Sequence, residues 1–470
     1  MTIDSGLHRE RSDAYVASLL ASACIVLYIF IFSVVFFLGS ANGVSLEKML
    51  ALNQVGTSDV TEYINLAHSM LEQGQFSLPD SGTEFLRVPG YPVFLALVLL
   101  IFRTLIVVPL LQILITACTV ALIYLIGVRY FPRPVAIAAA AIYMIDPIVI
   151  YAAWVPISEP LFMLFLMGSV YAIGVEARRV WVPFAAAGIL LAISVYMRPI
   201  GLYVAPIIAC MALAREQSWR TAIRNIAVFF IALICLISPW MVRNYILSGH
   251  FAFSSTGSYG LYANNMPLFE QVRTGTSYLA LQKKFNERFG TNDEHILRSF
   301  KYADEEVAIA HEVLLAHPFQ YMLFHLFKSA QLFVGSSIVN VTYHMHQFGI
   351  LSGEHAQGEG AWGMLTQHKY RDAFIQTFTH IPRLIERILW ALIYVSALYA
   401  TIRAIRRRSA HVSWIVCAFI LLNAFAILTG PVSDDTRYRM PLEPFLLLLG
   451  CFGAYTVWLH IRGKGEERIV

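Results

Sequence analysis

A polar interval between two long apolar blocks holds residues that could do chemistry. It runs over residues 53–92 and contains Asp59, Tyr63, Arg87 and Tyr91. An ionisable side chain close to a hydrocarbon region is costly unless it is paired or hydrated, so it is a functional candidate by default. Partial desolvation raises the pKa of a carboxyl group and makes it a better base. We therefore predict that Asp59 is a general base with a raised pKa, in a pocket lined by Tyr63 and Tyr91.

Arginines at the ends of several apolar blocks face the same side as Asp59. They are Arg87, Arg198, Arg243, Arg437 and Arg439. Arginine is normally enriched on the cytoplasmic side of membrane segments, so this set needs another explanation. Guanidinium groups bind phosphate oxygens through paired hydrogen bonds and stay charged when partly desolvated. We predict that these arginines bind a ligand phosphate, with Glu159 and Tyr438 in the same pocket.

Each of these residues also has a structural interpretation. Asp59 could cap the helix expected to follow it. Glu159 could complement the dipole of the helix that it begins, and Arg243 could extend its charged end to the membrane surface. The two aspartates of the loop 431–440 could neutralise its two arginines. The functional prediction therefore depends on these residues coming together.

The composition identifies the elements that must position these residues. Of the 470 residues, 58% are apolar and 14% are charged, against about 45–50% and about 25% in ordinary soluble domains. Apolar blocks of about 18 residues or more are typical of transmembrane helices. The sequence thus predicts an all-α polytopic membrane protein in contact with membrane lipids. The net charge of +4 comes from basic clusters in short loops, so we predict no nucleic-acid partner.

The basic clusters also predict the topology. Apolar stretches occur at 14–38, 91–102, 105–128, 134–155, 158–176, 182–197, 200–214, 225–242, 383–402, 412–430 and 441–460. Basic loops between them predict about ten crossings with both termini in the cytoplasm. The stretch 91–102 is too short to cross about 30 Å of hydrocarbon at 1.5 Å per residue, so we expect a partial or re-entrant helix. The amphipathic stretch 319–335 should lie at the interface, and Arg198 should form the outward tip of a hairpin.

Three regions follow from this topology. Residues 1–243 form an N-terminal transmembrane module that includes the catalytic outer loop 39–90. Residues 244–382 form a large helical region on the outer side. Residues 383–470 supply the last transmembrane helices and a cytoplasmic tail.

Several segments, taken in order, carry a resemblance to a known superfamily. They are SDVTEYINLAHSMLEQGQFS, RVPGYPVFLALV, ISEPLF, MRPIGL, PWMVRNYILSGHF, AHPFQYMLFHLFK and RYRMPLEPFLLLLG, which together span residues 58–450. The chain resembles GT-C-fold glycosyltransferases that use a polyprenyl-phosphate sugar, such as the protein O-mannosyltransferases and the lipid A aminoarabinose transferase. The resemblance implies a GT-C-like transmembrane helix bundle.

The resemblance also implies roles for individual residues. Asp59 matches the acidic position of the first outer loop, and Glu159 matches a second acidic position near the donor pocket. Arg87 and Tyr91 match the segment bordering that pocket, which the arginines of RYRMP close. The mannosyltransferases carry an Asp-Glu pair, whereas Val60 follows Asp59 here. A paired-carboxylate role is therefore not predicted. No cluster of metal ligands is recognisable, so no cofactor is predicted and a divalent metal is left open.

The implied reaction transfers a sugar, with inversion, from the polyprenyl-phosphate donor to a hydroxyl of a glycolipid, polysaccharide or protein. It would take place on the outer, periplasmic-type face of a cell membrane. A transporter or flippase of a lipid-linked phosphate or sugar would use similar arginines. Such proteins usually show inverted repeats and broken helices with midplane charges, and neither is recognisable in this sequence. A non-catalytic membrane subunit is a further alternative.

Overall fold

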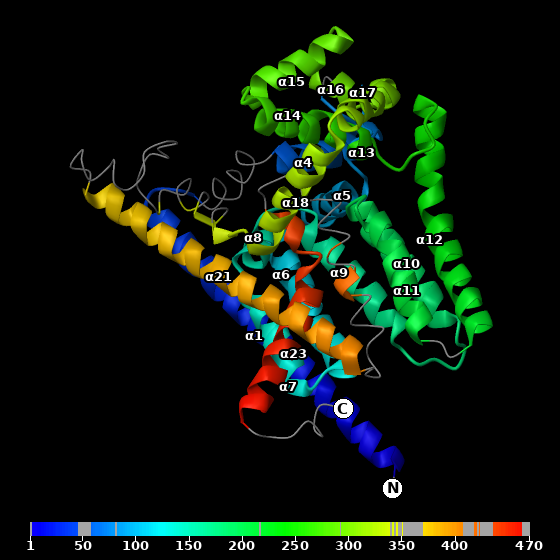
Figure 1. Cartoon of the computed structure of the whole chain (residues 1–470), viewed down its shortest axis with the longest axis vertical. Coiled ribbons are helices and arrows are strands. Elements are labelled where there is room, and N and C mark those ends of the chain that lie inside the picture. The colour runs from blue at the N-terminus through cyan, green and yellow to red at the C-terminus, as the bar shows by residue number, and fades with distance from the viewer. Residues whose placement is uncertain are drawn as a thin grey trace.

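The chain folds into a helical bundle that carries a smaller helical subdomain at one end (Figure 1). This computed structural model describes residues 2–45, 58–79, 82–215, 218–291, 293–338, 341–342, 345, 350, 370–407, 418–420, 423 and 436–462. Within them, the strands are β1 (Ser77–Leu78) and β2 (Gly82–Thr83), an antiparallel pair. The predicted all-α class is confirmed.

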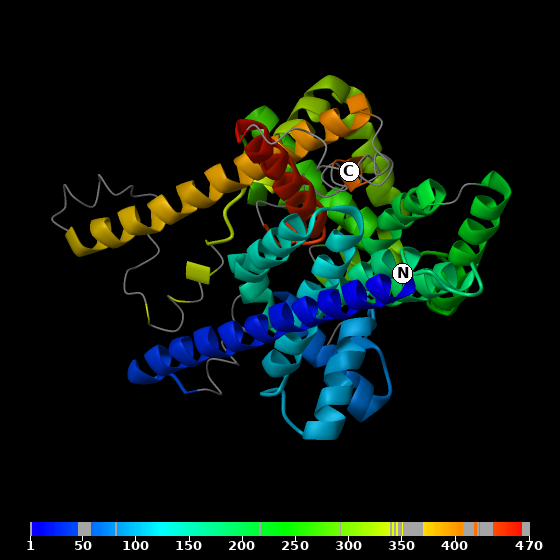
Figure 2. The ribbon, with the colours of Figure 1, turned by 90° about the horizontal axis from the view of Figure 1, so that it is seen from below.

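The helices of the bundle are long and apolar. They are α1 (Thr2–Ala41), α5 (Gly90–Phe102), α6 (Val108–Tyr130), α7 (Arg133–Ile145), α8 (Pro147–Trp154), α9 (Glu159–Ile173), α10 (Val182–Met197), α11 (Gly201–Arg215), α12 (Trp219–Ser248), α21 (Tyr370–Arg407) and α23 (Glu443–Ile461). Helices α6, α7 and α23 lie between α1 and α21 (Figure 2). Helices from both ends of the sequence thus share one apolar core.

Five described helices, α1, α6, α12, α21 and α23, are long and apolar enough to cross a membrane. Helices α7 and α8 form a sixth candidate, bent by 55° where Asp146 precedes Pro147. Shorter apolar helices are α5, α9, α10 and residues 201–211 of α11. The chain is therefore a multi-pass membrane protein. The count of about ten crossings stays a prediction, because most of the stretch 412–430 lies outside the described residues.

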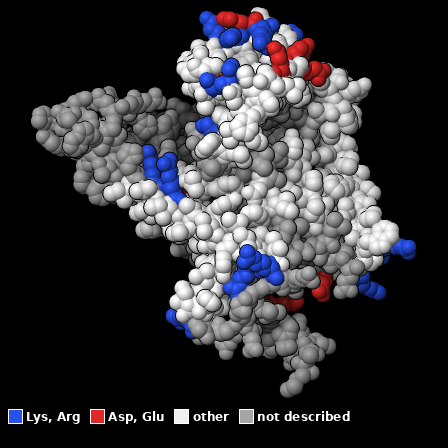
Figure 3. All heavy atoms as spheres, viewed as in Figure 1, with Lys and Arg blue, Asp and Glu red and all other residues white. Residues whose placement is uncertain are grey.

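The surface has the distribution of charge expected for such a protein. Figure 3 shows acidic and basic side chains gathered at the top of the view and a second set in its lower half, and the face between them is mostly uncharged apart from a group of basic side chains at the left. Large apolar side chains are exposed on α12 and α21, including Ile231, Ile234, Ile388 and Leu392. In water such a surface would be unfavourable, whereas lipid covers it without cost.

Small residues let helices of the bundle approach closely. A Cβ atom at Gly453 of α23 would lie 2.0 Å from the carbonyl oxygen of Ser396 on α21. A Cβ atom at Gly188 of α10 would lie 2.3 Å from the carbonyl oxygen of Phe229 on α12. Only glycine fits at these contacts, as is typical of membrane helix interfaces.

The smaller subdomain at one end of the bundle, which we call the outer subdomain after its predicted side of the membrane, is built from short helices after α12. They are α13 (Thr256–Tyr259), the π-helical turn η1 (Gly260–Asn265), α14 (Met266–Thr274), α15 (Tyr278–Asn286), η2 (Glu287–Phe289), α16 (Glu294–Leu297), η3 (Phe300–Tyr302), α17 (Ala303–Ala316) and α18 (Pro318–Val334). It has its own core around Tyr262, Met266 and Phe285. Helix α18 leads back towards the bundle and packs on α21. Its first turns expose Phe319 and Phe327, and its place at the membrane interface stays a prediction.

Candidate active site

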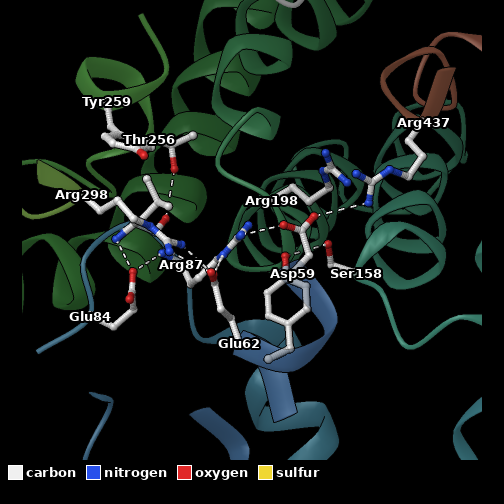
Figure 4. Close-up of polar contacts among 12 residues, drawn as sticks. Asp59, Glu62, Glu84, Arg87, Ser158, Arg198, Thr256, Tyr259, Arg298 and Arg437 are labelled. Atoms are coloured by element: carbon white, nitrogen blue, oxygen red, sulfur yellow. Dashed lines mark hydrogen bonds and ion pairs between the residues drawn. The ribbon is translucent and has the colours of Figure 1, made fainter. Parts of the chain in front are cut away.

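Asp59 lies where several helix ends meet beneath the outer subdomain. It is in the first turn of α4 (Ser58–Gln73). Arg87 Nη2 donates to Asp59 Oδ1 at 2.6 Å, and Arg437 Nη1 donates to Asp59 Oδ2 at 3.3 Å. Arg437 belongs to the 3-10 turn η5 (Thr436–Arg439), which leads into α23. The structure thus brings three predicted residues together from sequence positions up to 378 residues apart (Figure 4).

Glu159 and Arg198 form the other half of this site. Glu159 begins α9, with Pro160 as its next residue, a favoured position for proline in a helix. Arg198 ends α10 with an extended backbone, since the following Pro199 disfavours helical geometry at the residue before it. Arg198 Nη1 donates to Glu159 Oε1, and Arg437 Nη1 lies 3.9 Å from that oxygen. The predicted hairpin tip at Arg198 therefore points to the Asp59 end of the bundle.

Two guanidinium groups lie close together on one side of Asp59. Figure 4 shows those of Arg198 and Arg437 facing each other. The guanidinium carbon of Arg198 lies 5.4 Å from the ring centroid of Tyr438, which places that tyrosine at the site as predicted. Both arginine side chains are largely buried, at 19% and 13% exposed. Like charges this close repel each other. The Glu159 carboxylate offsets part of that repulsion, and a bound anion would offset more of it.

The charge state of Asp59 differs from the sequence prediction. Burial alone would raise the pKa of Asp59, but the positive charges of Arg87, Arg437 and Arg198 outweigh burial and hold that pKa well below its ordinary value. The predicted raised pKa is therefore wrong for the protein without ligand. The sequence placed the carboxylate near apolar blocks but gave no measure of how closely the arginines would approach it. Asp59 is ionised at neutral pH.

A second carboxylate, Glu62, was missed by the sequence analysis. It lies one turn after Asp59 on α4, and its Oε2 accepts from Arg87 Nε at 2.5 Å. Arg298 of the outer subdomain donates to both oxygens of Glu62, at 2.8 and 2.6 Å. Burial alone would raise the pKa of Glu62, but these two arginines lower it. The i,i+3 spacing from Asp59 could have indicated Glu62, whereas nothing in the sequence links it to Arg298.

The two predicted pocket tyrosines, Tyr63 and Tyr91, pack against each other, and Tyr63 contacts Arg87. The Arg87 guanidinium carbon lies 5.5 Å from the ring centroid of Tyr63. The Tyr63 hydroxyl lies 3.4 Å from Ser158 Oγ. Tyr91 packs edge-on against Tyr63, with ring centroids 5.0 Å apart, and donates to Gln112 Oε1 at 2.6 Å. Tyr91 is fully buried, so its role here is to support Tyr63.

Two of the predicted arginines do not join Asp59. Arg243 donates to the carbonyl oxygen of Glu84 at 3.1 Å, and its guanidinium carbon lies 4.5 Å from a ring centroid of Trp240. Arg439 has no solvent exposure and donates to Glu443 Oε1 at 2.9 Å. Its side chain turns into the bundle because buried carboxylates there attract it. The aspartates considered as its partners, Asp434 and Asp435, lie outside the described residues.

The carboxylates of the site do not form a metal-ligand set. Among the described residues, no group of three or more His, Cys, Asp or Glu side chains is arranged to hold a metal ion. Asp59, Glu62 and Glu159 each pair with arginine. We therefore derive no step through a metal.

Comparisons with known proteins confirm the resemblance found in the sequence. Residues 87–242 match the sequence model of the family described as dolichyl-phosphate-mannose-protein mannosyltransferase. The matched segment includes Arg87, Glu159 and Arg198, whereas Asp59 and Arg437 lie outside it. No curated protein matches the chain.

Two solved structures show similarity at low sequence identity. The Saccharomyces cerevisiae protein O-mannosyltransferase Pmt1-Pmt2 complex, bound to the sugar donor, is 12% identical, with a TM-score of 0.36 over 54% of this chain. The Archaeoglobus fulgidus oligosaccharyltransferase AglB, in complex with an inhibitory peptide and a dolichol-phosphate, is 12% identical, with a TM-score of 0.44 over 93% of this chain. The chain spans 36% and 51% of the lengths of these two proteins.

Proposed function

We propose that the protein is a membrane glycosyltransferase that moves a sugar from a polyprenyl-phosphate donor to a hydroxyl of an acceptor. The observation that carries this proposal is an ionised carboxylate, Asp59, next to the guanidinium groups of Arg198 and Arg437 at one end of an apolar bundle. The family match over residues 87–242 supports the same class of donor.

In this proposal the donor phosphate binds between Arg198 and Arg437. Arg87 is already held by two carboxylates, Asp59 and Glu62, at 2.6 and 2.5 Å. Arg198 and Arg437 approach the same oxygen of Glu159 from two elements, and the contacts of Arg437 with its two carboxylates are longer, at 3.3 and 3.9 Å. A phosphate would bridge them through charge-assisted hydrogen bonds. It would also need no proton when it leaves, because the two positive charges stabilise the charge that develops on it.

Asp59 would act as the general base. The acceptor hydroxyl gives its proton to Asp59 as its oxygen bonds to the anomeric carbon. The bond from that carbon to the phosphate oxygen breaks, and its electron pair leaves with the phosphate. One such displacement inverts the anomeric carbon. A bound phosphate would also draw Arg437 from Asp59 and so make the carboxylate a stronger base than it is without ligand.

The same proposal places the reaction on the outer face of a cell membrane, with both termini in the cytoplasm. Helix α4 and the outer subdomain lie at one end of the bundle, and the start of α1 and the end of α23 lie at the other (Figure 1). The donor's prenyl chain would lie against the exposed apolar surface of the bundle. The acceptor, which is a glycolipid, a polysaccharide or a protein, would enter beneath the outer subdomain.

The test uses the purified full-length protein with radiolabelled prenyl-phosphate sugars and a membrane extract as the source of acceptors. We expect label to leave the donor with wild-type protein and with Asp304→Asn, a control whose carboxylate is 90% exposed on α17. Asp59→Asn should abolish transfer while donor binding persists. Full transfer by Asp59→Asn would exclude this residue as the base. Donor that crosses vesicle membranes intact would instead indicate a transporter.

A further inference from the structure

The outer subdomain reaches the Asp59 site through one buried arginine. Arg298 lies between α16 and η3 and is 8% exposed. Its two terminal nitrogens donate to the two oxygens of Glu62, at 2.8 and 2.6 Å. Such a paired arrangement fixes both the distance and the plane of the carboxylate. Figure 4 shows Arg298 approaching Glu62 from the side opposite to Asp59.

The backbone around Arg298 is itself held in place. The Ser255 hydroxyl donates to the carbonyl oxygen of Arg298 at 2.5 Å, and Ser255 N donates to the carbonyl oxygen of Phe85 at 3.1 Å. The hydroxyls of Ser254 and Thr256 donate to the carbonyl oxygen of Leu86, at 2.6 and 3.0 Å. The subdomain is thus attached to the segment that carries Arg87. This attachment gives the Arg298 backbone a fixed position relative to Arg87, the other arginine that Glu62 binds.

Glu62 shares its charge between two arginines. Its Oε2 accepts from Arg298 Nη2 at 2.6 Å and from Arg87 Nε at 2.5 Å. Arg87 in turn uses Nη2 to hold Asp59 at 2.6 Å. Four side chains therefore form a continuous series of alternating charge, with two positive and two negative groups. If the charge of Arg298 were removed, Arg87 would be the one remaining arginine paired with Glu62 and would shift towards it, away from Asp59, which Arg437 also holds.

We propose that Arg298 is a positioning residue for the transfer reaction: through Glu62 it fixes Arg87, and through Arg87 the orientation of the Asp59 carboxylate. This inference rests on the proposed glycosyl transfer. It assigns the outer subdomain a part in the chemical step in addition to any contact with the acceptor. Misplacing a reacting group by about 1 Å can lower a rate by about 100-fold, so a distant ion pair is able to control turnover.

The experiment measures steady-state transfer by the full chain for Arg298→Gln, Arg298→Lys and Glu62→Gln. The matched control is Arg288→Gln, because Arg288 lies in the same subdomain and forms an exposed ion pair with Glu312 at 3.5 Å. The number of donor-binding sites is measured by equilibrium binding in each preparation. The turnover number kcat is then expressed per competent site, so that loss of folded protein does not count as loss of catalysis.

We expect Arg298→Gln to lower kcat about tenfold or more, with the donor KM unchanged within about twofold because Arg198 and Arg437 are untouched. Arg298→Lys should recover part of the loss, and Arg288→Gln should match wild type. The double variant Arg298→Gln/Glu62→Gln should be no slower than the slower single variant, since both substitutions break the same series of contacts.

The proposal is overturned if Arg298→Gln keeps the wild-type kcat per site, or if the two single effects multiply in the double variant. If Arg298→Gln does not fold, the same comparison is made with Glu62→Gln, which removes the charge that both Arg298 and Arg87 contact. A wild-type kcat per site in that variant would likewise overturn the proposal. Wild-type activity and its loss in Asp59→Asn test the proposed function separately, so a failure of one proposal can be told from a failure of the other.

Discussion

Arg439 and Glu443 form an ion pair in which neither side chain is exposed to solvent, with Arg439 Nε 2.9 Å from Glu443 Oε1. Asp146 and Glu386 lie 3.8 and 3.7 Å from Arg439 Nη2. The guanidinium carbon of Arg439 lies 4.0 Å from the ring centroid of Trp390. One cation thus holds together the α7–α8 bend, α21 and the start of α23, which follows the turn that carries Arg437.

The first prediction concerns this buried cation. Arg439→Ala should destabilise the protein by about 3–5 kcal/mol, because it leaves the buried carboxylates around it without a positive charge nearby. Thermal unfolding in detergent or lipid nanodiscs would measure the loss. Arg462→Ala, at the exposed end of α23, is the control and should change stability little. An equal effect of the two substitutions would contradict the structural role given to Arg439.

The second prediction separates the arginines at the site from those outside it. Arg437→Gln should lower kcat/KM for the donor about 100-fold or more, as expected when a group that stabilises developing charge is removed. Arg243→Gln should have a much smaller effect, since Arg243 contacts Glu84 and Trp240 instead of Asp59. Kinetics with varied donor concentration would distinguish them. Equal losses would show that the phosphate lies elsewhere.

The third prediction is a pH dependence of the outer subdomain. Burial raises the pKa of Glu306 on α17 from 4.5 to about 8, against the opposing effect of the Ser258 hydroxyl. An acid whose pKa is higher in the folded state binds its proton more tightly there. The contribution of the protonated Glu306 to the stability of the folded subdomain is therefore fully present below about pH 4.5, and it is lost as pH rises through about 8.

Hydrogen exchange of α17 at pH 6 and pH 9 would test this dependence. Exchange rates are first corrected for the faster intrinsic exchange at pH 9. We then expect the opening free energy of α17 in wild type to be lower at pH 9 than at pH 6, by on the order of 3 kcal/mol. Glu306→Gln should remove most of the difference, because glutamine cannot ionise. Glu305→Gln is the neighbouring control and should keep most of it. A difference that persists in Glu306→Gln would mean that another group titrates.

The fourth prediction concerns the contact between α21 and α23. Gly453→Ala should destabilise the bundle by about 1–3 kcal/mol, since the new Cβ would meet the backbone oxygen of Ser396, which cannot move independently. Gly257→Ala is the matched control, because a Cβ atom there has no neighbour within 4 Å. Thermal unfolding of both variants gives the comparison. Equal stability of Gly453→Ala and wild type would show that the helices separate without cost.

The sequence predicted residues of the candidate site where an ionisable side chain lies at the end of an apolar block. Asp59 and Arg198 are unusual for their positions relative to the apolar blocks, so topology alone predicts that they face one side. The bend at Pro199 and the short length of α5 follow from local rules of backbone geometry. The apolar composition predicted the helical class, and the topology predicted that Asp59 and Arg198 lie at the same end of the bundle.

The rest depends on side-chain pairing, which the sequence does not specify. Arg437 and Arg439 are two residues apart in one 3-10 turn, yet one faces Asp59 and the other enters the bundle. Their difference arises from which buried carboxylates each can reach. Similarly, Glu62 and Arg298 are 236 residues apart and meet only when the outer subdomain packs on α4.

The pairing of Asp59 with Arg437 has a consequence for biosynthesis. The carboxylate emerges early from the ribosome, and its partner is made 378 residues later, just before the final helix. A partly synthesised chain that holds Asp59 but not yet Arg437 therefore lacks one of the two arginines that donate to this carboxylate. In the proposed reaction, the site for the donor phosphate would be completed only when Arg437 has been made, so unfinished chains would not consume the donor.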